Sequence, residues 1–79
     1  MDKIINKIQR ELSSTRNKYP PFHSSHEGLG VILEEWDELK EAVRNNNISQ
    51  QRTEAIQLAA MAIRFIQDCC DSGNNNSIT

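Results

Sequence analysis

The sequence has little of the cysteine that would indicate a disulfide scaffold or a zinc site. Its only two cysteines, Cys69 and Cys70, are adjacent, and adjacent cysteines rarely reach the geometry of a mutual disulfide. No pair has the spacing of a zinc or redox motif. We therefore expect two reduced thiols near the end of a helix.

Long apolar runs and an excess of positive charge are also missing. No segment is apolar for long enough to cross a bilayer, and the N-terminus does not resemble a secretory signal peptide. The formal net charge is −2, whereas a general nucleic-acid binder is usually basic. These absences argue against membranes and long nucleic acids as partners, and they predict a cytoplasmic protein.

Proline and glycine are scarce, which leaves most of the chain free to form helices. The two prolines, Pro20 and Pro21, are neighbours and must end any helix that precedes them. The chain has no internal repeat, so we expect one domain over residues 1–71. Residues 72–79 are polar and without period, which predicts a disordered tail. A core this small is commonly completed by oligomerisation.

Apolar residues recur with helical spacing in three segments. The pattern predicts helices over about 2–15, 24–44 and 49–70, and hence an all-α fold. The second and third helices are separated only by the asparagines of 45–47, so they should form an antiparallel hairpin. Ser24, followed by Glu27 three residues later, fits a capping box at the start of the second helix.

The second helix carries the strongest apolar stripe, which we expect to face the core. Its members are Leu29, Ile32, Leu33, Trp36, Leu39 and Val43. The third helix is apolar on two opposite sides, along the line that includes Leu58 and Met61 and the line that includes Ile63 and Ile66. A three-helix chain can cover one of these sides, so the other predicts a second copy of the chain.

Three carboxylates lie beside these apolar lines. Glu35 and Glu38 flank the stripe of the second helix, and Glu54 heads a buried line of the third. At ~4 Å and an effective dielectric of about 20, each like-charge pair costs on the order of 4 kcal/mol, which a bound cation would relieve. Oxygen ligands favour Mg²⁺ or Mn²⁺, and hence a phosphate ester. The alternative is that these glutamates form an ordinary solvated surface.

Other residues are candidates for contact with a ligand. Arg16 and Lys18 could face an anion near the end of the first helix, or they could belong to its solvated basic side. Phe22 could contact a planar ring or simply cover the core. His23 and Trp36 complete the set of candidate substrate contacts, although a polar helix start is the commoner role for a histidine at this position.

The acidic residues also resemble a known family motif. Glu34-Glu35-x-x-Glu38, followed on the next helix by Glu54-x-x-Gln57, resembles the motif of the MazG-like all-α nucleoside triphosphate pyrophosphohydrolases. The segments 19–28 and 54–62 are similar to those of a small, often phage-associated branch of these proteins. The resemblance covers roughly residues 10 to 70.

This resemblance implies a homodimer or homotetramer that hydrolyses a nucleoside triphosphate to the monophosphate and pyrophosphate. By position, Glu35, Glu38, Glu54 and Gln57 correspond to the Mg²⁺ ligands. Glu34 corresponds to an acid that activates the water or has an accessory role, and Glu38 is expected to share in catalysis.

Gln57 is the departure from the motif, which has aspartate at this place. An amide oxygen can coordinate a hard cation but adds no negative charge. The departure favours an alternative function, a protein that binds a nucleotide without cleaving it, such as a phage sponge for a nucleotide defence signal. A third possibility is a structural bundle whose acidic cluster has no ligand.

Overall fold

The computed structural model describes residues 1–71, which form helices joined by two short connections. The elements are α1 (Asp2–Lys18), α2 (Ser25–Arg44), α3 (Ile48–Phe65) and a π-helical turn, η1 (Ile66–Cys70), which continues α3. The predicted all-α class is confirmed, and the described part contains no strand. The predicted tail, 72–79, lies outside the described residues.

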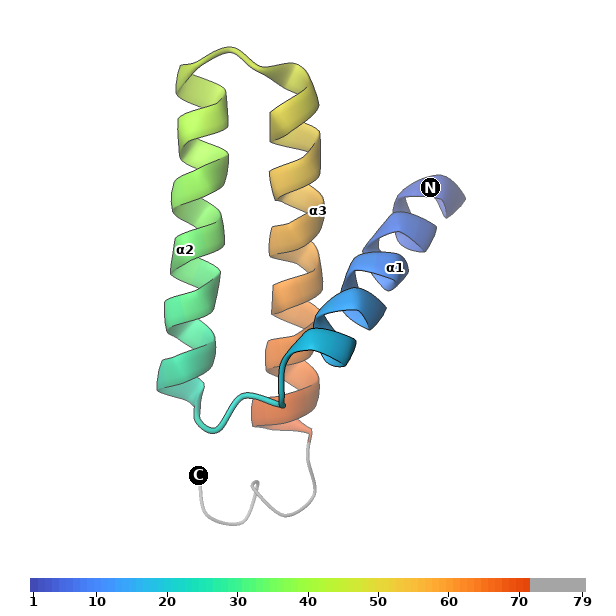
Figure 1. Cartoon of the computed structure of the whole chain (residues 1–79), viewed down its shortest axis with the longest axis vertical. Helices are drawn as coiled ribbons and strands as arrows, with labels where there is room; N and C mark the ends of the chain where they lie inside the picture. The colour runs from blue at the N-terminus through green and yellow to red at the C-terminus, as the bar shows by residue number, and fades with distance from the viewer. Residues whose placement is uncertain (72–79) are drawn as a thin grey trace.

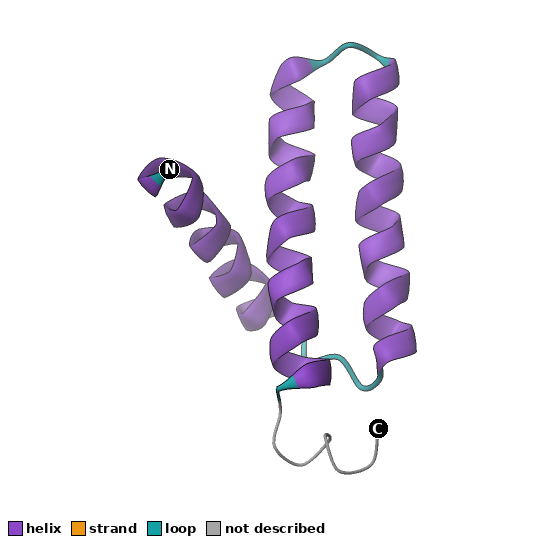
Figure 2. Ribbon diagram, turned by 180° about the vertical axis from the view of Figure 1, so that it is seen from behind, coloured by secondary structure: helices purple, strands orange, loops and turns teal. Residues whose placement is uncertain are grey.

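The helix α3 is the element that contacts both of the others. In Figure 1, α2 and α3 lie side by side and antiparallel, while α1 crosses the C-terminal half of α3 and diverges toward its own N-terminus. Figure 2 shows the same arrangement from behind. The predicted hairpin is therefore present.

The helix ends follow from capping residues and from the two prolines. Ser24 caps α2 by accepting a hydrogen bond from the backbone N–H of Glu27 over 3.1 Å, and the Glu27 carboxylate accepts from the N–H of His23 over 2.6 Å. The side chain of Asn47 caps α3, and Asn46 adopts a positive φ of 55° in the turn before it. Helix α1 continues to Lys18, one turn further than predicted.

A small core lies between the connection from α1 to α2 (residues 19–24, called the elbow below) and the inner face of α3. Its buried members are Phe22, Ala60, Met61 and Cys69, with partly buried side chains from all three helices around them. Gly28 allows this packing, because a Cβ there would lie 2.7 Å from the Phe65 ring and 3.1 Å from the Phe22 ring. Two aromatic rings, rather than another backbone, thus explain a glycine inside α2.

The prediction that the whole apolar stripe of α2 faces the core of the chain was wrong. Leu29, Leu33, Trp36 and Val43 are each about half exposed, with exposed fractions of 51%, 51%, 49% and 52%. α2 is rotated so that Gly28 and Ala42, two small buried residues, face inward. Small side chains permit close approach to α3, and this rotation carries Glu35 inward while it leaves four of the six stripe residues on the surface.

Candidate functional site

The three predicted metal-binding carboxylates do come together. One oxygen each from Glu35, Glu38 and Glu54 lie within 4.8 Å of one another. Glu54 is buried, Glu35 is partly buried and Glu38 is exposed. The cluster therefore has a buried base on α3 and an open side on α2.

Helical spacing and the hairpin explain this convergence. Glu35 and Glu38 are three residues apart on α2, so they project from neighbouring positions on one face. Glu54 lies in the second turn of α3, which runs antiparallel to α2. The rotation of α2 that exposes part of its apolar stripe thus directs the carboxylates of Glu35 and Glu38 toward Glu54 on α3.

Two glutamine side chains contact the buried base of the cluster. The Nε2 group of Gln50 donates a hydrogen bond to Oε2 of Glu54. One terminal atom of the Gln57 amide lies 2.9 Å from Oε1 of Glu54 and 3.1 Å from Oε2 of Glu35. With nitrogen at this place, Gln57 donates to both carboxylates; with oxygen there, it adds a fourth oxygen to the set. Gln57 can therefore donate to the carboxylates when no cation is bound, and it can turn its oxygen toward a cation when one is bound.

The electrostatics of the cluster are most evident at Glu35. Partial burial, and then the negative charges of Glu38, Glu54, Glu11 and Glu34, raise the pKa of Glu35 from 4.5 to about 7. A carboxyl group with such a pKa carries a proton for much of the time near neutral pH. A divalent cation would displace this proton, because it supplies the positive charge that the cluster lacks.

The donor set fits a hard divalent cation. All of the candidate ligands are oxygens, from three carboxylates and one amide, and oxygen-only sites of this kind suit Mg²⁺ or Mn²⁺ rather than zinc. The exposed side, at Glu38, leaves room for water or for an oxygen of a ligand.

A cavity of about 460 Å³ opens beside the cluster and is lined by its member Glu35 and by Gln57, which contacts the cluster. Four segments line this cavity: Glu11, Ser14, Thr15 and Lys18 from α1; Tyr19, Pro20 and Phe22 from the elbow; Glu27, Val31, Glu34 and Glu35 from α2; and Gln57, Met61 and Arg64 from α3. Its volume falls within the range of small-molecule sites. The cluster and the cavity together form a candidate site for a ligand that carries both anionic and apolar parts.

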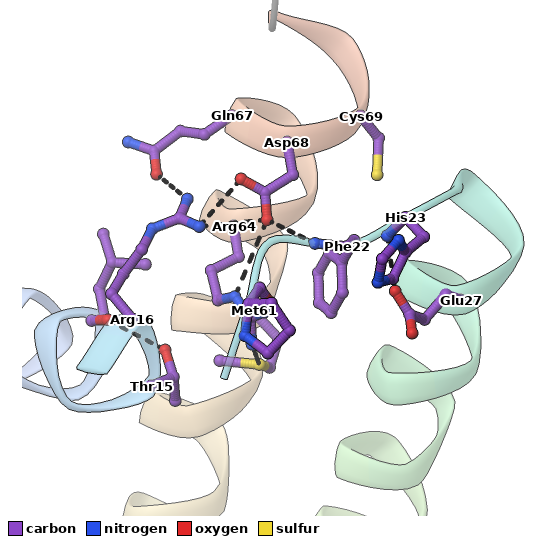
Figure 3. Close-up of polar contacts among 12 residues, drawn as sticks. Thr15, Arg16, Phe22, His23, Glu27, Met61, Arg64, Gln67, Asp68 and Cys69 are labelled. Atoms are coloured by element: carbon purple, nitrogen blue, oxygen red, sulfur yellow. Dashed lines mark hydrogen bonds and ion pairs between the residues drawn. The ribbon is translucent and has the colours of Figure 1, made fainter. Parts of the chain in front are cut away.

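The structure brings some of the predicted substrate contacts to this cavity. Lys18, Phe22 and the candidate acid Glu34 line it. Arg16 instead forms an ion pair with Asp68 over 2.9 Å and bonds to Gln67 over 2.6 Å (Figure 3).

The other two predicted contacts also lie elsewhere. His23 is exposed, at the start of α2. Trp36 is on the outer stripe, where the ammonium group of Lys40 lies 4.8 Å from the centre of its ring. Neither residue lines the cavity that adjoins the cluster.

Arg64 is a cavity residue that the sequence reasoning missed. It is 3% exposed and lies on the same face of α3 as Glu54, Gln57 and Met61, at intervals of three or four residues. The sequence does carry a sign of its role, because Arg64 follows Met61 by three residues and so lies on the same buried face of the helix. Its partner Asp68 was also missed, since it acts across the fold on Arg16 and on the backbone of Phe22.

Comparison of the chain with models of protein families, with curated proteins and with solved structures finds no match. Among the described residues, no helix combines the length and the apolar character that crossing a membrane requires.

Proposed function

We propose that this chain binds a nucleoside triphosphate, or a related nucleotide, through a divalent cation and hydrolyses it to the monophosphate and pyrophosphate. The observation that carries the proposal is that the acidic cluster adjoins the cavity: Glu35 belongs to both, and Gln57, which contacts Glu35 and Glu54, also lines the cavity. The likeness of Glu34-Glu35-x-x-Glu38 to the pyrophosphohydrolase motif supports the same reaction. A nucleotide substrate is consistent with a place in the cytoplasm.

The proposed roles of the side chains follow from their positions. Mg²⁺ or Mn²⁺, when bound, would neutralise phosphate oxygens and lower the pKa of a bound water. Glu35, Glu38 and Glu54 would hold this cation, and the oxygen of Gln57 would complete the set. Glu34 lines the cavity next to the cluster and would accept the proton of the attacking water.

Two further side chains support binding at the cavity. Lys18 lines the wall formed by α1 and would pair with the phosphates. Phe22 would contact a planar part of the ligand.

A second copy of the chain belongs to the proposal. The exposed stripe formed by Leu29, Leu33, Trp36 and Val43 is an apolar surface on a chain with a small core. Covering it in a homodimer or homotetramer would build the larger helical bundle that the sequence predicts.

One observation favours a second candidate function, in which the nucleotide is held without cleavage. Gln57 contacts both Glu54 and Glu35 and brings no negative charge. A site with three carboxylates rather than four binds Mg²⁺ less tightly and positions it less strictly. Such a site would suit a sponge that sequesters a nucleotide signal.

One experiment tests both functions. The purified protein is incubated with a panel of nucleotides and Mg²⁺, and the products are separated by chromatography after denaturation. Release of pyrophosphate supports the hydrolase, and recovery of bound, intact nucleotide supports the sponge. In either case Glu38→Gln should abolish the effect, because it removes a ligand from the cation. The matched control is Glu41→Gln, an exposed glutamate on α2 outside the cluster. Absence of any nucleotide binding would contradict both functions.

A further inference from the structure

The cavity has two ends of different chemistry. One end adjoins the acidic cluster through Glu35 and Gln57. The other end is formed by the elbow residues Tyr19 and Phe22 and by the buried side chain of Arg64. A ligand whose phosphates lie at the cluster would extend its remaining part toward the elbow.

Arg64 has more hydrogen-bonding capacity than its protein neighbours use. Its Nη2 group donates to the carbonyl oxygen of Pro20 over 2.9 Å, and Nη1 contacts the sulfur of Met61 over 3.7 Å. Among the described residues, Nε has no hydrogen-bond partner. A guanidinium group has five N–H donors, so a buried one with a single oxygen acceptor is far from satisfied.

The terminal nitrogens of Arg64 are the ones next to the cavity. Nη1 and Nη2 contact Met61 and Pro20, and both of these residues line it. Nε lies on the other side, 4.0 Å from the carboxylate of Asp68 (Figure 3). Each of these contacts uses one of the two N–H groups on its nitrogen, so the second N–H on Nη1 and on Nη2 is left for a ligand in the cavity.

The surroundings of Arg64 favour a neutral acceptor over a second phosphate. The carboxylate of Asp68 already offsets part of its positive charge. The ring of Phe22 lies over the guanidinium, with its centre 4.1 Å from Cζ, so the face of the group is covered. What remains is a set of donors in the plane of the guanidinium, beside an aromatic ring. This arrangement suits the carbonyl edge of a planar base.

The spacing along α3 is also suitable. Gln57 and Arg64 are seven residues apart on α3, which is about 10 Å along the helix axis. This is close to the distance between the phosphates of a nucleotide and its base.

We infer that Arg64 selects the base of the bound nucleotide by donating a hydrogen bond to a ring carbonyl oxygen. The inference rests on the proposed function, since the phosphates must be held at the acidic cluster. It predicts that a 6-oxopurine is preferred over adenine. The 6-amino group of adenine is a hydrogen-bond donor and could not accept from the N–H groups of Arg64.

The test compares two ligands that differ at this edge, the α,β-methylene analogues of ITP and ATP. These analogues cannot release pyrophosphate, so turnover does not disturb the measurement. Isothermal titration calorimetry in Mg²⁺ should give a dissociation constant about tenfold or more lower for the inosine compound, as expected for one good base contact. This comparison uses the unaltered protein and does not depend on the folding of a variant.

A variant then assigns the preference to Arg64. In Arg64→Gln the amide can accept as well as donate, so the ratio of the two dissociation constants should fall toward one. Arg52→Gln is the control, because Arg52 is exposed on α3 and does not line the cavity. Circular dichroism establishes that each variant is folded.

Each outcome has a definite meaning. Equal binding of the two analogues, lost in Glu38→Gln, would overturn the inference while the proposed nucleotide site stands. A preference that persists unchanged in folded Arg64→Gln would also overturn it. If neither analogue binds in the presence of Mg²⁺, the proposed function fails and the inference fails with it.

Discussion

Gln57 lies where the two proposed functions diverge. With its amide nitrogen toward the cluster, it donates to a carboxylate on each helix of the hairpin and relieves the repulsion between Glu54 and Glu35 without a cation. An aspartate at this position would remove that relief and would add a fourth negative charge. In the proposed site, this residue would therefore set how strongly the cluster depends on a bound cation.

The substitution Gln57→Asp should raise the affinity for Mg²⁺ by about tenfold or more, because the charge of the ligand set governs cation affinity. It should also lower the melting temperature in EDTA, where four carboxylates repel one another. Calorimetric titration and thermal melts measure the two effects. Thr53→Asp adds the same charge at an exposed position of α3 and should change neither. Unchanged Mg²⁺ affinity in Gln57→Asp would show that this side chain is not a ligand.

Glu35 predicts a pH dependence of stability in the absence of cations. Its pKa is raised to about 7 in the folded chain, chiefly by burial and then by Glu38, whereas the ordinary value is 4.5. Between these values the unfolded chain releases the proton first, so stability falls as pH rises from 4.5 to 7. Solvent at this partly buried carboxyl screens its charge, so we expect a loss of about 1–2 kcal/mol.

Glu35→Gln removes this loss and should be more stable than the parent at pH 8 but not at pH 4. Urea unfolding in EDTA at the two pH values measures the difference, and Glu41→Gln controls for the general removal of a negative charge. An equal effect of Glu35→Gln at both pH values would contradict the assignment. Mg²⁺ affinity should rise with pH through the same window, because the cation competes with the proton.

At the scale of the helices, the glycines of α2 offer a matched pair. A Cβ at Gly28 would lie 2.7 Å from the ring of Phe65, whereas nothing lies within 4 Å of a Cβ at Gly30. Gly28→Ala should destabilise the fold by about 1–3 kcal/mol through overpacking. Gly30→Ala should stabilise α2 by about 1 kcal/mol. Thermal or urea unfolding measures both, and equal effects would contradict the packing at Gly28.

The elbow between α1 and α2 is joined to the end of α3 by one carboxylate. Asp68 accepts from the guanidinium of Arg16 and from the backbone N–H of Phe22, and it also lies near Arg64 (Figure 3). The π-helical turn contains this residue, whose side chain is 7% exposed. The change from α-helix to π-helix at the end of α3 thus accompanies the placement of the Asp68 carboxylate against the elbow backbone.

Asp68→Asn should destabilise the fold by about 3 kcal/mol, because it leaves the buried charge of Arg64 without its anion. Asp71→Asn is the control, since Asp71 is exposed and follows the turn. Chemical unfolding of both variants gives the comparison. A loss no larger than that of the control would mean that the elbow is held by packing alone.

The helices could be predicted because their determinants are local. Apolar spacing, the capping serine at 24, the prolines and the asparagine turn all act within a few residues. The convergence of Glu35 with Glu54 followed from the hairpin. The partners of Arg64 and Asp68 could not be predicted, because Asp68 meets Phe22 across 46 residues and Arg64 meets Pro20 across 44.

The rotation of α2 could not be predicted either. Periodicity gives the direction of an apolar stripe, but it does not say which neighbour will cover that stripe. Leu29 and Ile32 belong to one stripe, yet Ile32 packs on the core and Leu29 is half exposed. The choice depends on how closely α2 approaches α3 at Gly28 and Ala42.

For the whole molecule, the exposed stripe predicts self-association. Leu33→Glu places a charge within it and should convert an oligomer into monomers, because a buried charge at an apolar interface lacks a partner. Light scattering coupled to size-exclusion chromatography measures the mass. Gln9→Glu, an exposed change on α1, should leave the oligomer intact. A monomeric parent chain would contradict this prediction.

Two hydrogen bonds join the elbow to α3 and to the turn that continues it, and on the elbow side both are made by backbone atoms. Asp68 binds the N–H of Phe22, and Arg64 binds the carbonyl of Pro20, so neither bond requires a particular side chain there. Tyr19 also lines the cavity and takes part in neither bond. Substitution of Tyr19 would therefore alter the wall of the cavity, and with it the ligands that could fit there, while the two bonds from α3 to the elbow backbone are kept.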